Sequence, residues 1–267
     1  MATIHVSELY IYPIKGCRRI ALTDMPVGPT GPEHDRRWMV IGPDNKFISQ
    51  RTHPIFALIT AHADAGSLYV KVPNHPELKV PITEFGDSIE ATIWKDQCQV
   101  VEQSKEASAL LSDYLGINCR LVTMAPGGSR LVGPKYAKRP ADQVAFADDH
   151  PFLIISQASL DQLNSLLPAA VEMNRFRPNI VVTGTGAYDE DKWEKIRIGD
   201  IILDAGKLRA RCLITTIHQD TGKKEGSEPL RTLAKYRTTE KGVMFGKTFL
   251  HASQGTIRIG DEIEVLE

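Results

Sequence analysis

The 267-residue sequence predicts a mostly-β fold of the α+β class, built as two β-barrel-like domains. Short segments rich in β-branched and aromatic residues recur at turn-sized spacing, each bounded by Gly, Pro, Asp or Asn, which is typical of antiparallel sheets and barrels. Only three segments have helical periodicity, too few to cover a parallel α/β sheet. A stretch rich in Gly, Pro and cations over residues 125–143 favours a domain boundary there. We therefore expect one domain over residues 1–124 and a second over 125–267.

The first half is predicted to contain five strand segments and one helix. In the helical segment Leu111 and Leu115 follow Ala107 at one-turn spacing, and Gly116 stands where a C-terminal cap belongs. The strand segments are more apolar and are bounded by turn-forming residues. They cover residues 6–14, 37–41, 56–63, 67–72 and 89–101.

The second half is predicted to contain two further helices between strands. Ser159 and Gln162 fit a capping box at the start of a helix in SLDQLNSLL. In SEPLRTLAKYR, Ser227 is the expected N-cap and Pro229 lies in the first turn. Compact apolar segments predict strands over residues 151–156 and 179–184.

One pentapeptide, IRIGD, occurs twice, at residues 196–200 and 257–261. Each copy is followed by another β segment, IILDA after the first and EIEVL after the second. Two copies are too few for a repeat array, whereas Gly-Asp suits a tight turn between strands. We therefore expect each copy to form a hairpin with the segment that follows it.

The charge balance excludes several classes of partner. The formal net charge is −1 and the isoelectric point is near 6.7, so the basic footprint of a nucleic-acid-binding protein is missing. No apolar run approaches the length of a membrane span, and the N-terminus does not have the pattern of a secretory signal. We expect a cytoplasmic protein whose partners are small molecules or other proteins, not nucleic acid or a membrane.

The four cysteines are Cys17, Cys98, Cys119 and Cys212. They are far apart and form no CxxC pair, so neither a zinc site nor an iron–sulfur cluster is expected. In a chain without a signal they are expected to stay reduced. Cys212 differs from the others because it follows two arginines in RARC. It is either small core filler or a thiolate held among cations, which would serve as a nucleophile or a metal ligand.

Four cationic patches are predicted at strand ends, where a pocket can collect them. They are YPIKGC with Lys15, EHDRRW with Arg36, NRFRPNIVV with Arg177, and RARC. Each patch alone is explained as solvated charge, but together beside a thiol they could form an anion pocket around a sulfur ligand. The sequence contains no P-loop, dinucleotide fingerprint, HExxH or GxSxG motif.

In these motifs the sequence resembles the MOSC family, and within it the amidoxime-reducing proteins that have an N-terminal MOSC β-barrel domain. The combination of FRPNIV with RCLITTIHQDTG is specific to that resemblance, which implies an N-terminal barrel domain over residues 1–124 and the MOSC domain over 125–267. It runs nearly end to end, through YPIKGC, DRRWMVI, DDHPFLIISQASLDQLN, NRFRPNIVVTG, RCLITTIHQDTG, EPLRTLAKYR and GTIRIGD.

The resemblance implies a molybdenum cofactor, in which one pyranopterin dithiolene holds the metal and one protein cysteine completes its ligands. The matching position is Cys212, as metal ligand and catalytic residue, and molybdenum accepts soft thiolate donors. In a regular strand Arg211 and Cys212 would point to opposite faces, so both can serve one pocket only if the chain bends there. Cationic and polar groups would hold the phosphate and pterin. The full implied set is Lys15, Gly16, Arg36, Asp149, His150, Arg177, Asn179, Ala210, Arg211, Cys212 and Thr248.

Four of these positions depart from the family pattern. Gly16 stands where relatives have serine, Asp149 and His150 replace a Thr-Ser pair, and Thr248 replaces a tyrosine. The departures are expected to affect the choice of substrate and not the binding of the cofactor.

The implied function is that of an oxidoreductase that reduces N-hydroxylated or N-oxide compounds by two-electron oxygen-atom transfer. Some relatives carry a C-terminal ferredoxin domain, and this sequence has no such cysteine-rich motif. We therefore expect a separate electron donor, which would be a reductase, a ferredoxin or a flavoprotein. Two alternatives stay open: a carrier of sulfur or of the molybdenum cofactor, and a binding module that lost the metal. The presence of Cys212, Arg177 and Asn179 argues against the second.

Overall fold

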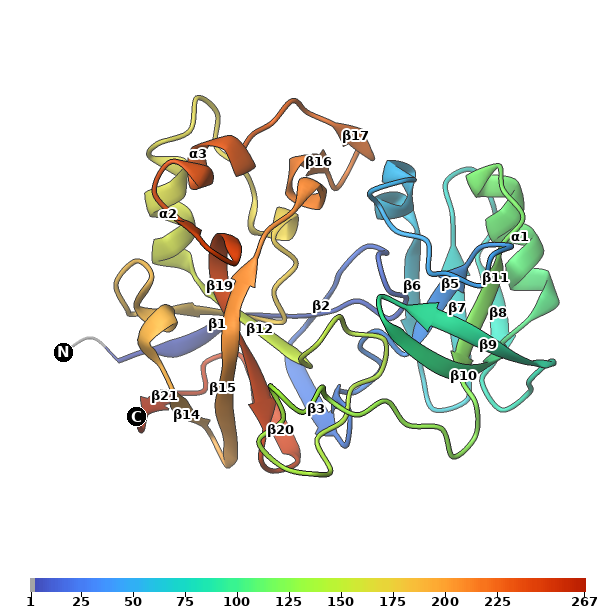
Figure 1. The fold of residues 1–267 in the computed structure, drawn as a ribbon, viewed down its shortest axis with the longest axis horizontal. Coiled ribbons are helices and arrows are strands. Elements are labelled where there is room, and N and C mark those ends of the chain that lie inside the picture. The colour runs from blue at the N-terminus through green and yellow to red at the C-terminus, as the bar shows by residue number, and fades with distance from the viewer. Residues whose placement is uncertain (1–2) are drawn as a thin grey trace.

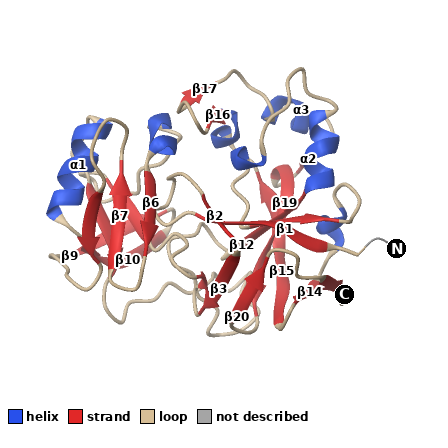
Figure 2. Cartoon of the chain, turned by 180° about the vertical axis from the view of Figure 1, so that it is seen from behind, coloured by secondary structure: helices blue, strands red, loops and turns tan. Residues whose placement is uncertain are grey.

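The computed structural model describes residues 3–267 and is built mainly from strands (Figures 1 and 2). Within that range the chain forms twenty-one strands in five sheets and three α-helices, which confirms the mostly-β, α+β fold class. None of the helices in this range has the length and apolar character needed to cross a membrane. Four short 3-10 helices complete the secondary structure: η1 (Pro54–Leu58), η2 (Met173–Arg175), η3 (Asp189–Lys192) and η4 (Leu213–Thr216).

The largest sheet forms the C-terminal half of the molecule (Figure 1). In hydrogen-bonded order its main path is β2 (Ile20–Leu22), β1 (His5–Ile11), β13 (Ile180–Thr183), β12 (Phe152–Ser156), β19 (Gly242–His251), β15 (Ile201–Ala210), β14 (Lys195–Ile198) and β21 (Ile263–Val265), and β18 (Thr238–Thr239) pairs with β19. Only β12 and β13 run parallel among these pairs. A bridge between His5 and Glu262 returns the sheet toward β1 without closing a continuous barrel.

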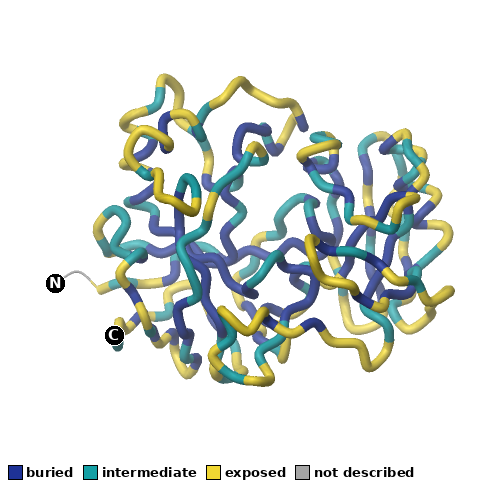
Figure 3. Tube along the Cα trace, viewed as in Figure 1, coloured by how far each residue is buried: buried dark blue, intermediate teal, exposed yellow. Residues whose placement is uncertain are grey.

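A second unit, at the right of Figure 1, contains two smaller sheets and α1 (Lys105–Leu115). Trp38, Leu68 and Leu111, from the two sheets and the helix, are fully buried in one apolar cluster, which appears as the dark interior of this unit in Figure 3. One sheet has the order β5 (Trp38–Ile41), β11 (Arg120–Met124), β10 (Asp96–Glu102) and β9 (Ser88–Ile93), and the other has β6 (Thr60–Ala63), β7 (Ser67–Lys71) and β8 (Leu78–Pro81).

The beginning of the chain packs with the C-terminal half. β1 and β2 belong to the large sheet, and a separate sheet joins β3 (Asp24–Gly28) and β4 (Gly31–Pro32) to β20 (Gly255–Arg258). A last pair, β16 (Ile217–His218) and β17 (Lys223–Lys224), lies near η4. The division at residues 124 and 125 stays a prediction, but strand pairing crosses it, so the two halves of the molecule are not two consecutive halves of the sequence.

The ends of two helices test the predicted caps. Gly116 has the left-handed φ of 68° that a C-terminal cap needs, as expected for α1. The capping box at Ser159 is wrong, because α2 (Gln157–Asn164) begins earlier and is capped by Ser156. The Ser156 hydroxyl accepts from the Ser159 backbone N–H at 3.1 Å, while the Ser159 hydroxyl donates to buried Glu190 at 2.7 Å. The Ser159 side chain therefore bonds to Glu190 and does not cap the helix.

The third helix, α3 (Leu230–Ala234), is also capped differently from the prediction. Ser227 was the expected N-cap, but its side chain makes no capping bond. The Glu228 carboxylate accepts instead from the Thr232 backbone N–H at 3.0 Å. A carboxylate at the first turn also suits the helix dipole, which explains why this longer side chain replaces the serine hydroxyl.

The two IRIGD copies have different partners. The first forms the expected hairpin, in which Ile198 lies opposite Ile201. The second does not, because β20 pairs with β3 and β21 pairs with β14. The backbone between them bonds to the start of the chain, with Gly260 N–H donating to Val6 O and Ile263 N–H to Ile4 O, both at 2.8 Å. The chain between the strands is therefore unavailable for a tight hairpin turn.

Residues 56–63 are a further partial correction, because a single strand was expected there. Residues 56–58 lie in η1, and the strand β6 begins at Thr60. Pro54 stands in the first turn of η1, where its fixed φ favours a helical start.

Candidate active site

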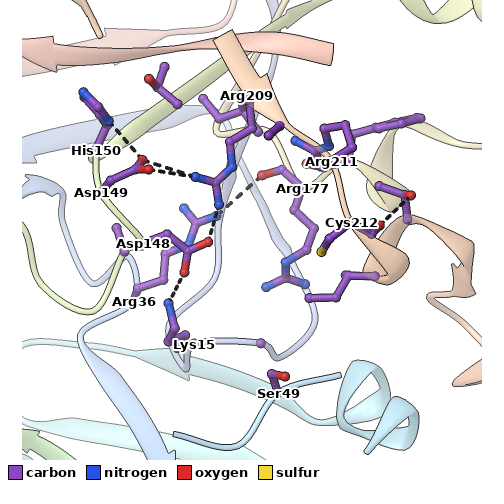
Figure 4. Close-up of a pocket in the computed structure, with 18 of the residues that line it drawn as sticks. Lys15, Arg36, Ser49, Asp148, Asp149, His150, Arg177, Arg209, Arg211 and Cys212 are labelled. Atoms are coloured by element: carbon purple, nitrogen blue, oxygen red, sulfur yellow. Dashed lines mark hydrogen bonds and ion pairs between the residues drawn. The ribbon is translucent and has the colours of Figure 1, made fainter. Parts of the chain in front are cut away.

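A pocket of about 160 Å³ lies between the C-terminal half, which contains the large sheet, and the second unit, which contains α1 (Figure 4). Its walls come mostly from strand ends: the chain leaves β1 before Lys15, and β15 ends at Ala210. The loop after β5 contributes Ser49 and Arg51 from the opposite side. The structure brings the complete set of sequence-predicted site residues to this pocket: Lys15, Gly16, Arg36, Asp149, His150, Arg177, Asn179, Ala210, Arg211, Cys212 and Thr248.

Cys212 lies just after the end of β15, where the chain bends. Ala210 is the last strand residue and η4 begins at Leu213, so Arg211 and Cys212 are outside the regular strand and both line the pocket. The Cys212 carbonyl accepts from the Thr215 backbone N–H at 3.1 Å and from its hydroxyl at 2.9 Å. These bonds fix the backbone that carries the thiol. The chain bends here, as it must if Arg211 and Cys212 are to serve one pocket.

Cys212 is also the most accessible of the four cysteines. Cys17, Cys98 and Cys119 are buried in apolar clusters, whereas Cys212 is partly exposed. Burial raises the pKa of each of the other three thiols, which makes their reactive thiolate forms scarce. The Cys212 sulfur is therefore the one that a ligand in the pocket can reach.

One side of the site pairs its cations with carboxylates. Lys15 Nζ donates to Asp148 at 2.5 Å, and Arg209 forms an ion pair with the same carboxylate. Asp149 receives Arg209 at 3.2 Å and also pairs with Lys207. Burial alone would raise the pKa of Asp148, but Lys15 and Arg209 hold it well below its usual range. These five residues form the paired wall.

The opposite side contains cations without carboxylate partners. Arg177 donates to the Cys17 carbonyl at 2.7 Å, and Arg211 donates to the Phe176 carbonyl at 2.5 Å. The Nε atom of Arg211 is buried without a hydrogen-bond partner. Desolvation lowers the pKa of Arg177 to about 10 and that of Arg211 to about 9. Among residues 3–267 neither guanidinium forms an ion pair, and together with Cys212 they form the carboxylate-free wall.

Arg36 contacts Asn179 and shares the Tyr12 ring with Arg177 of the carboxylate-free wall. Arg36 donates to Asp35 at 2.5 Å and to Asn179 Oδ1 at 2.9 Å. Its guanidinium lies 4.4 Å from the centre of the Tyr12 ring, and that of Arg177 lies 4.1 Å from the same ring. Both arginines have positive φ, 46° for Arg36 and 57° for Arg177, which is uncommon for residues with long side chains. The aromatic contacts hold both guanidinium groups in place.

The departures at Gly16, His150 and Thr248 have local structural reasons. Gly16 has a φ of 92°, and a Cβ there would lie 2.9 Å from the Phe56 ring. The Thr248 hydroxyl is engaged with the backbone N–H and carbonyl of Lys207, both at 2.9 Å. The Asp149 carboxylate accepts a hydrogen bond from His150 Nδ1 at 3.0 Å, and the Nε2 atom of His150 is buried without a partner. All three residues line the pocket.

Sequence reasoning missed three residues that contribute directly to the site. Asp148 lies in the family motif DDHPFLIISQASLDQLN but is not among the predicted site residues, although it binds two cations of the paired wall. Arg209 was visible in RARC but was not included in the predicted set. Arg51 comes from the loop after β5, and its Nη2 atom lies 3.3 Å from the Cys212 sulfur. No sequence motif marks Arg51, so only its position in the folded structure identifies it as part of the site.

The arrangement can bind an anionic group that brings its own metal. Within residues 3–267 no three His, Cys, Asp or Glu side chains are grouped to hold a metal ion. Cys212 is thus offered as a single soft donor. The guanidinium groups beside it present planar, bidentate donors that suit a phosphate or a polar heterocycle.

Comparisons with known proteins match both parts of the chain. The MOSC domain family matches residues 141–264, and the MOSC N-terminal beta barrel domain family matches residues 3–118. Mitochondrial amidoxime-reducing component 1 of Mus musculus is 34% identical over 280 residues, covering 98% of this chain and 82% of the relative. The Homo sapiens protein of that name is 33% identical with the same coverage. Molybdenum cofactor sulfurase of Oryza sativa subsp. japonica is 27% identical over 92% of this chain and 32% of its own length.

Proposed function

The chain belongs to the MOSC family, and we propose that it binds the molybdenum cofactor around Cys212 and reduces N-hydroxylated compounds. The mouse and human relatives are named for amidoxime reduction, and the rice relative for the molybdenum cofactor. The observation that carries the proposal is the carboxylate-free wall, where two guanidinium groups without acidic partners stand beside the accessible thiol. A buried cation without a counter-charge is unfavourable, and an anionic cofactor would supply that charge.

The residues of the pocket fit such a cofactor. Cys212 would be the thiolate ligand, while Arg177 and Arg211, whose Nε atom has no partner, would receive the anionic and polar groups. Lys15 and Arg36 line the same pocket and would add donors. When bound, the cofactor would supply two-electron oxygen-atom-transfer chemistry. The chain itself would bind and orient it, and would exclude water from the partly buried thiol.

The overall reaction would be the reduction of an N–OH group to N–H. The N–O bond breaks and an N–H bond forms. Two electrons and two protons are taken up, one proton by the nitrogen and one by the hydroxyl oxygen, which is released as water. The electrons would come from a separate donor protein, which would be a reductase, a ferredoxin or a flavoprotein. The cytoplasmic location expected from the cysteines stays a prediction, since the mouse and human relatives are named as mitochondrial proteins.

The proposal is tested by the metal and pterin content of protein made in a host that synthesises the cofactor. We expect near-equal molybdenum and pterin in the wild type and loss of molybdenum in Cys212→Ser. Cys98→Ala is the matched control, because Cys98 is buried away from the pocket. A Cys212→Ser protein that keeps stoichiometric molybdenum would contradict the ligand assignment.

A reduction assay separates the enzyme from the carrier. Loaded protein should reduce benzamidoxime with a reduced viologen as electron donor. If it binds the cofactor but reduces no N-hydroxylated compound, and if a cysteine desulfurase places a persulfide on Cys212, the chain is a sulfur or cofactor carrier. The similarity to the rice sulfurase is the observation that favours this second candidate.

A further inference from the structure

Trp94 occupies an unfavourable turn beside the pocket. It begins the two-residue turn between β9 and β10, in which Ile93 lies opposite Asp96, and its φ is 56°. Turns of this kind favour Asn or Gly, because a bulky side chain rarely adopts positive φ. Trp94 is also 47% exposed, whereas Trp38 and Trp193 are buried. Neither turn propensity nor burial explains tryptophan at this position.

The side chain of Trp94 is instead held toward the active site. In Figure 1 the β9–β10 turn points toward the C-terminal half. The indole Nε1–H donates to Asp148 of the paired wall at 3.1 Å. The Trp94 ring packs edge-on against Phe47, with 5.0 Å between the ring centres. The Arg51 guanidinium lies 4.8 Å from the ring centre. The indole thus forms a fixed platform under Arg51.

Arg51 lies where two cavities meet. It lines the pocket around Cys212 and also a larger cavity of about 1070 Å³ that shares Asp148 and Arg209 with the pocket. Four other cations of the larger cavity have acidic partners: Arg130 pairs with Asp96 at 2.6 Å, and Lys207, Arg209 and Lys247 also form ion pairs. Lys95 and Lys241 line the same cavity without such a partner, but neither lines the pocket around Cys212. Among the described residues, Arg51 has no such partner, and its one side-chain hydrogen bond goes to the Cys212 sulfur. A guanidinium has five N–H donors, so most of those of Arg51 remain available.

We propose that Arg51 is the specificity residue for an anionic group on the substrate, and that Trp94 positions it. The proposal rests on the function proposed above and narrows its substrate class. Because Arg51 Nη2 lies only 3.3 Å from the Cys212 sulfur, the anionic group must lie close to the reacting N–O bond. The class that fits is an N-hydroxylated compound with a carboxylate on the carbon that carries the nitrogen, such as a 2-oximino acid. Arginine binds a carboxylate through two parallel N–H donors.

Two substrates of similar size test this subsite in cofactor-loaded protein. The oxime of pyruvate has a carboxylate where the oxime of acetone has a methyl group. With a reduced viologen as donor, the wild type should favour the pyruvate oxime by about tenfold or more in kcat/KM, the effect expected of a hydrogen bond to a charged group. In Arg51→Gln this preference should fall to near one through a higher KM. Lys95→Gln is the control, because Lys95 lines the larger cavity but not the pocket.

The positioning role of Trp94 is tested by two substitutions. Trp94→Asn suits the positive φ of the turn but removes the platform, so the preference should fall while the melting temperature does not. Trp94→Phe keeps an aromatic face and should retain most of the preference. If both variants lose the preference equally, or if neither does, Trp94 does not act as a platform for Arg51.

A binding measurement separates failure of this proposal from failure of the proposed function. Without an electron donor, the pyruvate oxime should quench tryptophan fluorescence, since Trp94 is the exposed tryptophan, and Arg51→Gln should weaken binding about tenfold or more. Reduction of benzamidoxime without any preference for the carboxylate would overturn the subsite and leave the enzyme intact. Loss of molybdenum in Arg51→Gln would also overturn it, because Arg51 would then hold the cofactor. Tight binding of the pyruvate oxime without any reduction would support the subsite and count against the reductase.

Discussion

Both walls of the pocket contain cationic side chains, but the partners of those cations differ. In the paired wall Lys15, Lys207 and Arg209 meet Asp148 and Asp149. In the carboxylate-free wall Arg177 and Arg211 donate only to carbonyl oxygens. The number of cations is therefore a poor guide to where an anion binds. A buried cation that has no carboxylate partner is the better guide, because it still requires an anion to balance its charge.

The difference also separates stability from binding. A cation that already has a carboxylate contributes to the fold, and its removal leaves the acid behind. A cation without one weakens the fold of the empty protein, since its desolvation is compensated only by carbonyl groups and neighbouring aromatic rings. We therefore expect substitutions in the two walls to have opposite signatures, with stability affected in one and ligand retention in the other.

The largest effect is expected from Asp148→Asn in the paired wall. Lys15 is only 8% exposed and would lose its ionised partner, whereas Arg209 would lose one of its two and keep Asp149. Breaking a buried ion pair at one partner costs about 3–5 kcal/mol. Urea unfolding of the cofactor-free protein measures this loss. Asp44→Asn, which removes an exposed carboxylate paired with Lys46, should change stability by less than about 1 kcal/mol, and equal losses in both variants would refute the comparison.

Arg211→Met should have the opposite signature. We expect retention of molybdenum and pterin to fall about 10–100-fold, the range found when a group that supports a metal site is removed. The cofactor-free variant should unfold at an unchanged or higher urea concentration, because a desolvated charge without an acid is replaced by an apolar side chain. Arg197→Met is the control, since Arg197 is an exposed residue of β14 that lies opposite Ile202, near the start of β15, and does not line the pocket. A stability loss in Arg211→Met like that of Asp148→Asn would place Arg211 in the scaffold.

Acid should weaken the paired wall alone. The pKa of Asp148 is lowered in the fold relative to its usual value of 3.8, and that of Asp149 is lowered too. Their contribution is therefore complete above that value and is lost as the pH falls from there through the folded-state pKa. The free energy of unfolding should fall between about pH 6 and pH 3 in both proteins. The fall in Asp148→Asn should be smaller than that in the wild type by about 1–2 kcal/mol. Arg211→Met should follow the wild-type slope, because arginine stays charged throughout.

The sequence predicted a set of site residues that the structure brings to one pocket, although it did not mark Asp148, Arg209 or Arg51. Lys15, Arg36, Arg177 and Arg211 each stand at a predicted strand end or in a family motif, and all four line the pocket. Their partners could not be read from the sequence. Lys15 meets Asp148 133 positions further along the chain, whereas Arg211 finds no acid, and nothing local distinguishes the two cases.

The same limit applies to the fold. Strand segments were predicted because alternation and turn residues are local properties. Pairing is not local: the two IRIGD copies are identical, yet only the first forms a hairpin with the strand that follows it. The first strands of the chain also pair with the C-terminal half, across the predicted boundary. Arg51 is the extreme case, because only the packing of the two units brings it to Cys212.

The smallest effect is expected at the outer edge of the paired wall, in Lys207→Met. The Lys207 side chain is 33% exposed, and Asp149 keeps Arg209 at 3.2 Å and His150 at 3.0 Å when the lysine is removed. A solvent-screened pair whose acid has other partners contributes less than about 1 kcal/mol. Thermal and urea unfolding should therefore barely change, and molybdenum retention should equal that of the wild type. A loss as large as that of Asp148→Asn would show that the total charge of the paired wall matters, and not which of its ion pairs are buried.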